Sequence, residues 1–335
     1  MISRWLPALF GLLGLALLIG LVVHGGSTDI LALLATAGWG LLWLVPFHVL
    51  PIALDAEGWR VLLRHRDAGG RAHLPFLWWI ASVREAVGRL LPVGGVGGEV
   101  VGIRLTLWRV PDGAAVTASV VMETLLTIVN VYLFVAAGLC LAIALDGGDL
   151  AGTLLGGLAA TLPVPLLLYA LLRHGAVFAR IERAMVGMLG EESRVAALFG
   201  DAARLDTELL ALFARRRDLL VSLVWQLAGM VAGSFEVWLA LQLLGQPISP
   251  LAAIALEALG LSVRHFAFFV PAGLGVQEMG FVLFGRLLGV PPDAAVALSL
   301  AKRTRELGYG IPALLSWQWA ELRRAWRRKR PGDQR

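Results

Sequence analysis

The chain has 335 residues, of which 58% are hydrophobic and 16% are charged, against about 25% charged residues in an ordinary soluble domain. This composition excludes a soluble globular protein and indicates a single transmembrane domain, because no polar stretch is long enough to bury a core of its own. The net charge of +5 comes from arginines that lie beside apolar segments. Since this distribution is typical of membrane proteins, we expect no nucleic-acid partner.

Apolar segments of about 20 residues, the length that spans a bilayer, recur along the chain. The first segment, 5–23, follows Arg4 and has no small-residue cleavage site behind it, so we interpret it as an uncleaved span and not as a signal peptide. The other predicted spans are 30–54, 114–145, 151–172, 219–244 and 294–319, the last of which contains four charged residues.

Basic residues concentrate in alternate connections between these spans. Four arginines lie in 55–74, eight lie in 173–218 and seven basic residues follow Glu321, whereas the connections 24–29, 146–150 and 245–250 contain none. Arginine and lysine accumulate on the cytoplasmic side of membrane proteins. We therefore predict that both termini are cytoplasmic, and that a transmembrane domain over 1–320 is followed by a basic cytoplasmic tail over 321–335.

The cytoplasmic loop 174–218 has apolar residues at helical spacing among its charges, such as Ile181, Met185, Leu209 and Phe213. This pattern predicts amphipathic helices that lie on the membrane surface. A helical hairpin exposed to solvent fits the same pattern.

Two intervals, 75–113 and 251–293, remain between the spans, and each is predicted to form a hairpin. The first has short charged arms separated by PVGGVGG. We interpret it as re-entrant, because irregular backbone at membrane depth needs protein or water around it. The second has longer arms and is long enough to cross fully. In either case the connections on both sides require the two hairpins to point in opposite directions.

The two hairpins share a motif, SVREAVGRLLPVGGVGGE from Ser82 and SVRHFAFFVPAGLGVQE from Ser262. Equal spacing relates Pro92, Gly94 and Glu99 in the first copy to Pro271, Gly273 and Glu278 in the second. We therefore predict an all-helical fold of two inverted-topology repeats, with halves at 1–145 and 146–320. In transporters of this kind the binding site lies near the midplane between the halves.

Ionisable residues inside apolar segments are costly and usually face a partner or water, so they are the candidates for substrate binding. The candidates are Arg84, Glu99, Glu123, Glu236, Glu257, Arg264, Glu278, Lys302, Arg303 and Arg305. Glu99 and Glu278 follow the glycine-rich breaks. They either bind a cation or cationic headgroup beside a water-filled cavity, or cap the helix that each begins, which would contribute about 0.3–1 kcal/mol.

Superposition of the repeats on Ser119 and Ser299 places Glu123 opposite Arg303. A pair between these two residues would lie near the axis, where it would serve either the substrate or only the attachment of the halves to each other. Arg84 and Arg264 each end a Ser-Val-Arg triplet. They would either hold a lipid phosphate or extend to the membrane interface.

Signals of soluble enzymes are absent from the sequence. GGVGG fits neither a phosphate loop nor a dinucleotide fingerprint, the six histidines lack metal-ligand spacing, and no Gly-x-Ser-x-Gly elbow occurs. We therefore expect no metal, no cofactor and no enzymatic activity. The one cysteine, Cys140, excludes a disulfide within the chain.

The segments REAVGRLLPVGGVGGEVVGIRL, FVPAGLGVQEMGFVLFGRLLGV and AKRTRE resemble the flippase-like membrane family related to the transmembrane region of lysylphosphatidylglycerol synthase. The stretch AGWGLLWLVPFHVLPIALDAEGWRVLL and the GGEVVGIRL variant are most similar to the hopanoid-biosynthesis-associated branch. The resemblance covers essentially the whole chain. It implies a multi-pass protein of the bacterial inner membrane that moves a lipid, such as a hopanoid or a phospholipid, between leaflets or toward the outer membrane.

The signature positions of the family correspond here to Pro92, Gly97, Gly98, Glu99, Pro271, Gly273, Gly275, Gln277, Glu278, Lys302, Arg303 and Glu306. The prolines and glycines, with Gly94, are the predicted hinge and loop positions. The soluble aminoacyl-transfer domain of the full-length synthase has no counterpart after the last span, so we do not expect lipid aminoacylation.

Two other functions fit the same sequence. In the first, an intramembrane lipid-modifying enzyme uses Glu123 or Glu257 as a general base. In the second, the protein transports nothing and holds lipid-biosynthetic partner proteins together through the loop 174–218.

Overall fold

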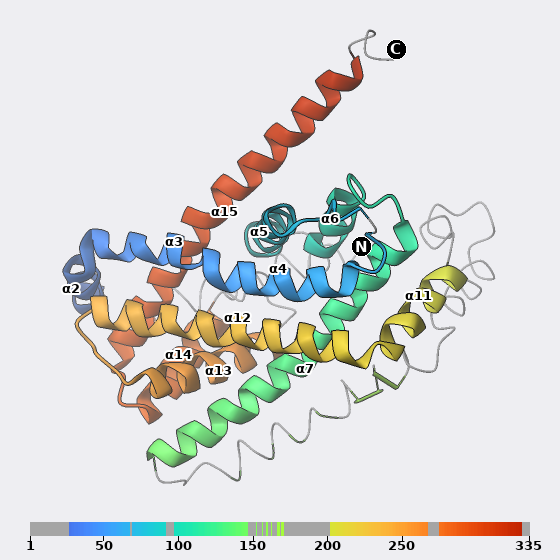
Figure 1. Ribbon diagram of the computed structural model, residues 1–335. Coiled ribbons are helices and arrows are strands. Elements are labelled where there is room, and N and C mark those ends of the chain that lie inside the picture. Colours follow the sequence, from blue (N-terminus) through green and yellow to red (C-terminus); the bar gives the residue numbers. More distant parts are fainter. Residues whose placement is uncertain are drawn as a thin grey trace, which may run out of the picture.

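The computed structural model describes residues 27–67, 69–91, 97–146, 202–266 and 275–329, with a few single positions between 152 and 170 (Figure 1). Every regular element in these ranges is a helix. The helices are α2 (Ser27–Ala37), the 3-10 helix η2 (Gly38–Trp43), α3 (Leu44–Phe47), α4 (Val49–Leu63), α5 (Leu74–Leu90), α6 (Gly97–Thr106), α7 (Gly113–Asp146), α11 (Ala202–Ala214), α12 (Arg216–Leu243), α13 (Pro250–Phe266), α14 (Val276–Leu287) and α15 (Pro292–Lys329).

Three helical segments in the described residues are long and apolar enough to cross a membrane, namely Thr28–Leu63, Gly113–Leu145 and Arg216–Leu243. They contain most or all of the predicted spans 30–54, 114–145 and 219–244. The predicted span 5–23 lies outside the described residues, as does most of 151–172. The predicted span 294–319 is helical but is not among the three, because its buried charges lower its hydropathy.

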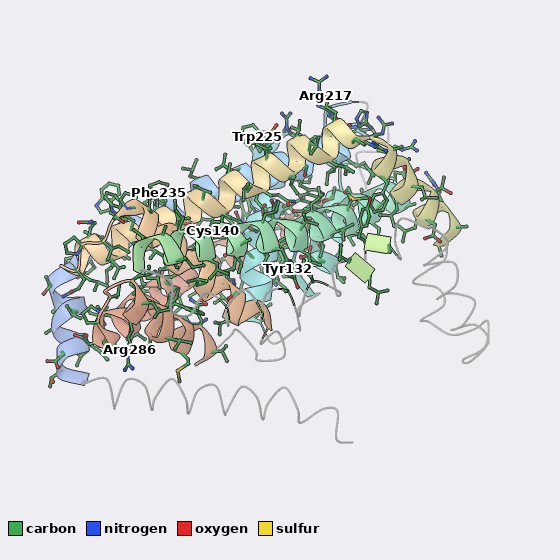
Figure 2. All side chains as sticks on the ribbon, turned by 90° about the horizontal axis from the view of Figure 1, so that it is seen from below. Tyr132, Cys140, Arg217, Trp225, Phe235 and Arg286 are labelled. Atoms are coloured by element: carbon green, nitrogen blue, oxygen red, sulfur yellow. The ribbon has the colours of Figure 1, made fainter. Side chains whose placement is uncertain are left out.

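Side chains on the outer face of α12 agree with an apolar environment. Trp225 and Phe235 project away from the other helices in Figure 2, and each is 36% exposed. Arg217 lies at the start of the same helix, beyond these apolar side chains. Large exposed apolar residues beside a basic helix end are typical of a helix that faces lipid and ends at the headgroups.

Both predicted hairpins are built from a longer helix followed by a shorter one. α5 and α6 have 17 and 10 residues, and α13 and α14 have 17 and 12. At 1.5 Å per residue, even the longer arms reach about 25 Å, less than the roughly 30 Å of the bilayer core. The helix breaks fall at the predicted motifs, although 92–96 and 267–274 themselves lie outside the described residues. The inverted relation of the two halves stays a prediction.

Close helix contacts bring the two halves together. α4 lies beside α12 (Figure 1), and α15 packs against α5 while α13 packs against α7. Gly229 of α12 leaves room for α4, since a Cβ there would lie 3.2 Å from the Pro51 carbonyl oxygen. Small residues allow such contacts in membranes. The charged residues of α5 therefore face those of α15.

The described part of the predicted loop 174–218 includes α11, which packs partly on the protein. Leu205, Leu209 and Leu212 of α11 are buried in a cluster with residues of α4 and α7, among them Met122 and Leu125. These leucines are covered by the protein, whereas Leu210 is 43% exposed, and the position of the loop at a membrane surface stays a prediction. The part of the loop from 174 to 201 lies outside the described residues.

The last helix continues through the predicted boundary at residue 320. α15 runs without interruption from Pro292 to Lys329, and its C-terminal part projects beyond the other helices in Figure 1. The buried charges near residue 305 and the basic C-terminal turns therefore belong to one helix.

Candidate functional site

Arg84 is the centre of a buried charged cluster in the first half. Its Nη1 donates to Glu123 Oε2 at 2.7 Å and its Nη2 donates to Glu99. Its guanidinium carbon lies 4.8 Å from the centre of the Trp59 ring. We call Arg84, Glu99, Glu123 and Trp59 the Arg84 cluster. The pairing excludes the alternative in which Arg84 extends to the membrane interface.

Glu99 is the accessible member of this cluster. Its side chain is 30% exposed, whereas those of Arg84 and Glu123 are 11% and 6% exposed. Glu99 lies in the first turn of α6, where a carboxylate also complements the helix dipole. Its hydrogen bond nevertheless runs to α5, so it joins the two arms of the hairpin.

Two glycines let the arms approach at Arg84. A Cβ on Gly98 would lie 2.5 Å from the Arg84 carbonyl oxygen, and one on Gly102 would lie 2.5 Å from the Arg84 Cδ. Both positions belong to α6, one turn apart. Only glycine leaves room for α5 at these two positions, so the Gly-x-x-x-Gly spacing forms the inner surface of the hairpin.

Gly98→Ala is expected to lower the free energy of unfolding by about 1–3 kcal/mol, because the added methyl group must push the two arms apart. Thermal unfolding of the purified protein in detergent measures the change. Gly88→Ala is the matched control, since nothing lies within 4 Å of a Cβ at this α5 position. The control should be neutral or stabilising by up to about 1 kcal/mol. Equal midpoints for the two variants would contradict the close packing at Gly98.

Glu278 is the corresponding carboxylate of the second half, in the first turn of α14. Its Oε1 accepts hydrogen bonds from Ser299 Oγ at 2.9 Å and from Arg303 Nη2 at 3.3 Å. The side chain is fully buried, and its Oε2 has no hydrogen-bond partner. Gly275 precedes α14 with a φ of 74°, a conformation that glycine adopts without strain.

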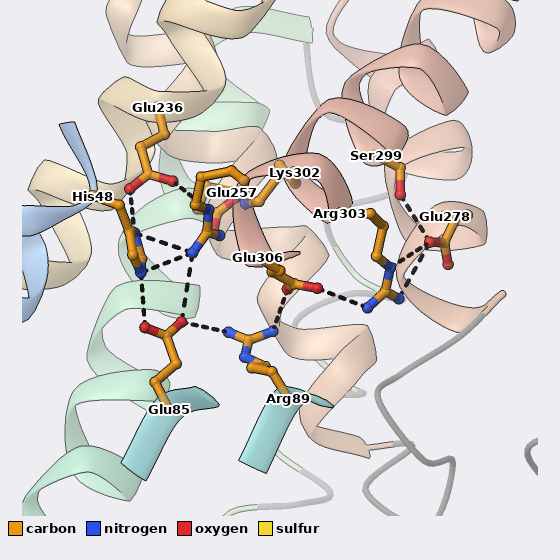
Figure 3. A network of polar contacts seen from close by, with 11 residues as sticks. His48, Glu85, Arg89, Glu236, Glu257, Glu278, Ser299, Lys302, Arg303 and Glu306 are labelled. Carbon is orange, nitrogen blue, oxygen red and sulfur yellow. Dashed lines mark hydrogen bonds and ion pairs between the residues drawn. The ribbon is translucent and has the colours of Figure 1, made fainter. Parts of the chain in front are cut away.

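A continuous series of ion pairs leads from Glu278 to α5 (Figure 3). Arg303 Nη1 pairs with Glu306 Oε2 at 3.0 Å, and Arg89 Nη1 pairs with Glu306 Oε1 at the same distance. Arg89 also lies 3.8 Å from Glu85. These contacts connect the second half of the chain to the first hairpin.

The series ends in a ring of four side chains. His48 Nε2 lies 2.8 Å from Glu85 and His48 Nδ1 lies 2.5 Å from Glu236. Arg305 closes the ring, at 3.5 Å from Glu85 and 3.4 Å from Glu236. We call His48, Glu85, Glu236 and Arg305 the His48 ring. Its members come from the α3–α4 junction, α5, α12 and α15.

Beside the ring, Lys302 pairs with Glu257 of α13 at 2.6 Å. Lys302 Nζ also lies 5.2 Å from the centre of the Phe281 ring. A small recess adjoins the ring and is lined in part by Glu85, Arg89, Arg305 and Tyr309. No group of residues suited to a metal ion occurs in the described ranges.

The predicted pair between Glu123 and Arg303 is replaced by two separate pairs. Glu123 binds Arg84, and Arg303 binds Glu278 and Glu306. The alignment of the repeats related the two positions in sequence only, and each side chain has its partner within its own half. Of the other predicted residues, Pro92, Gly94, Pro271 and Gly273 lie outside the described residues, and so does the side chain of Arg264.

Sequence reasoning missed His48, Glu85 and Arg89 as members of the site. The position of His48 in the sequence lacks metal-ligand spacing and gives no other indication of a role. Glu85 and Arg89 are spaced i, i+4 on α5, which is also the spacing of an ordinary ion pair on a helix surface. One feature of the sequence does indicate their role: Glu85 and Arg89 lie in an apolar helix, where an unpaired charge is costly, so each is expected to have a partner.

Comparison with known proteins gives one family. A model described as the lysylphosphatidylglycerol synthase TM region matches residues 8–327. No curated protein and no solved structure matches the chain.

Proposed function

The chain belongs to the family of the lysylphosphatidylglycerol synthase transmembrane region, and on this premise we propose that it moves a polar lipid between the leaflets of the bacterial inner membrane. The lipid class is a hopanoid derivative with a polar headgroup or a phospholipid. The observation that carries the proposal is the continuous series of largely buried ion pairs between the two halves, which begins at Glu278 in the first turn of α14 (Figure 3).

Charges within a membrane are expensive and usually line the path of a polar substrate. A structural core needs few of them, because apolar residues of the same volume stabilise as well or better. Among the described residues of the Arg84 cluster and of the network around the His48 ring, six charged side chains of both signs are buried, namely Glu123, Glu236, Glu278, Lys302, Arg305 and Glu306. The phosphate of a lipid headgroup can take the place of a carboxylate in one of these ion pairs, and an amine can take the place of a basic side chain, one pair at a time.

The two motif carboxylates differ in accessibility, and this difference supports a direction of approach. Glu99 is 30% exposed whereas Glu278 is fully buried. A headgroup would therefore meet Glu99 and Arg84 first, and Glu278 would become accessible only after the pairs of α15 rearrange. Such unequal exposure fits alternating access, in which one side of the site is closed while the other is open.

Liposomes that contain the purified protein and a fluorescent lipid in both leaflets test the proposal. A membrane-impermeant quencher reports how fast the lipid changes leaflets, across a panel of headgroups that includes a hopanoid derivative. We expect the wild type to move at least one lipid. Glu99→Gln and Glu278→Gln should each lower the rate at least tenfold, because a neutral amide no longer holds Arg84 or Arg303 in the resting position.

Glu57→Gln is the matched control, since Glu57 forms a surface pair with Arg60 within α4. It should leave the rate unchanged, and all variants should elute as the wild type does on size exclusion. Normal transport by both Glu99→Gln and Glu278→Gln would refute the site. A lipid product of changed mass would identify an enzyme instead of a translocator.

A further inference from the structure

We propose that His48 is a proton-binding site, and that its proton is exchanged in step with lipid movement, so that a transmembrane proton gradient drives translocation. The inference deepens the proposed function and rests on it. The proton adds to an imidazole nitrogen from water and returns to water from the same nitrogen.

Both ring nitrogens of His48 face carboxylates. Nδ1 lies 2.5 Å from Glu236 Oε1 and Nε2 lies 2.8 Å from Glu85 Oε2. An ionised carboxylate only accepts hydrogen bonds, and a neutral imidazole donates from one nitrogen alone. Two such contacts at once are therefore satisfied only when both nitrogens carry a proton. The two carboxylate contacts together correspond to an imidazolium.

Arg305 also contacts these nitrogens. Its Nη1 lies 3.1 Å from Nδ1 and 2.8 Å from Nε2, within hydrogen-bond distance of both. A guanidinium only donates, so a hydrogen bond from Nη1 requires a ring nitrogen that carries no proton. The same four side chains therefore hold either a neutral imidazole that accepts from Arg305 or, in the protonated state, an imidazolium between two carboxylates.

The charges of the wider network agree with this state. The side chains drawn in Figure 3 comprise four basic residues and five glutamates in addition to His48 and Ser299, namely Arg89, Lys302, Arg303 and Arg305 against Glu85, Glu236, Glu257, Glu278 and Glu306. With these groups ionised, the network is neutral when His48 is protonated and carries one negative charge when it is not. An excess charge is costly in a membrane.

The groups that face His48 come from every helix packed around it. α5 contributes Glu85 and α12 contributes Glu236. α15 contributes Arg305 and Tyr309, whose ring meets the imidazole edge-on at 4.9 Å. Arg89, Glu257, Lys302 and Glu306 lie one contact further out. Among all these side chain types, only histidine ordinarily changes charge between pH 5 and 8.

The ring joins helices that must separate if the site opens. His48 and Glu85 belong to the first half, whereas Glu236 and Arg305 belong to the second. Loss of the proton leaves two carboxylates that share one arginine, and their repulsion weakens the connection between the halves. The recess lined by Glu85, Arg305 and Tyr309 lies next to the ring, and we assign it as the side from which water reaches His48. Proton binding at His48 thereby favours the closed arrangement.

Proteoliposomes with an imposed pH difference test the coupling. Lipid movement is measured with and without the gradient and after a protonophore collapses it. For the wild type we expect the gradient to change the rate at least fivefold and the protonophore to cancel this change. His48→Gln should move lipid at one rate under all three conditions. Glu85→Gln, which keeps the imidazole but removes one of its carboxylates, should lose the gradient dependence in the same way.

His65→Gln is the matched control. His65 also pairs with a carboxylate, Asp218, but lies outside the His48 ring, so the gradient dependence should persist. If the wild-type rate of lipid movement does not change with the gradient, the coupling is refuted and translocation is not. The same holds if the rate of the His48→Gln variant still changes with the gradient.

Nuclear magnetic resonance of histidine-labelled protein separates failure of this inference from failure of the proposed function. The His48 ring signal, identified by its loss in His48→Gln, should shift between pH 5 and 9. Absence of lipid movement under every condition would refute translocation and with it the coupling. A ring signal that shifts in that case still supports the proton site, and one that stays constant overturns it.

Discussion

Arg84→Gln is expected to lower the free energy of unfolding by about 3–5 kcal/mol, the cost of breaking a buried ion pair from one side. The substitution leaves Glu99 and Glu123 without their shared cation. Asp55 of α4, which also interacts electrostatically with Arg84 and Glu99, adds a third carboxylate to the same region. Without the arginine these acids repel one another, and the contact between α5, α6 and α7 weakens.

Thermal unfolding in detergent, followed by size-exclusion chromatography, measures the effect. The double variant Arg84→Gln with Glu123→Gln should recover a large part of the loss, because it removes the most buried of the orphaned acids. Arg60→Gln serves as the control, since Arg60 forms an exposed pair with Glu57 worth at most about 1 kcal/mol. An Arg84→Gln protein as stable as this control would show that the buried pairs contribute nothing to the fold.

Glu257→Leu is expected to have a similarly large effect, again about 3–5 kcal/mol. It leaves Lys302, whose side chain is only 7% exposed, without the carboxylate that lies 2.6 Å from Nζ. Lys302→Met should cost less, because Glu257 is the more exposed partner and water can replace the lysine. The double variant Lys302→Met with Glu257→Leu should approach the stability of the wild type, since an apolar pair replaces an ionic one.

The same three variants decide what Lys302 does. Lipid movement in the liposome assay is measured beside each unfolding midpoint. A stable double variant that still moves lipid would identify the pair as structural. A stable double variant that does not would place Lys302 in contact with the substrate, as predicted from the sequence. Additive single effects in the unfolding data would contradict direct pairing of the two residues.

The sequence predicted the break points of the hairpins and the identity of several buried charges, because these depend on local chemistry. The proline and the clustered glycines of PVGGVGG disfavour a continuous helix, so α5 ends just before Pro92 and α6 begins at Gly97. Glu99, Glu123 and Glu278 stood out because they interrupt apolar segments. The family resemblance rests on these same local motifs, and the family model matches the chain over residues 8–327.

Partner choice could not be predicted in the same way. Arg84 lies between Glu99 and Glu123 because Gly98 and Gly102 allow α6 to contact α5 there, and that distance is set by three-dimensional packing. Likewise His48 meets Glu236 across 188 positions of the sequence. The repeat aligned Glu123 with Arg303 in sequence, yet Glu123 pairs with Arg84 and Arg303 pairs with Glu278 and Glu306.

α15 has a mechanical consequence that follows from its continuity. From Glu306 to Lys329 the helix rises about 35 Å at 1.5 Å per residue, so a tilt of about 10° at Glu306 displaces the far end by about 6 Å. Pro312 lies inside the helix and removes one backbone hydrogen bond, but α15 continues through it to Lys329. A small rearrangement of the buried charges therefore produces a larger displacement at the C-terminal end of α15, and a spin label near Trp326 would measure it there.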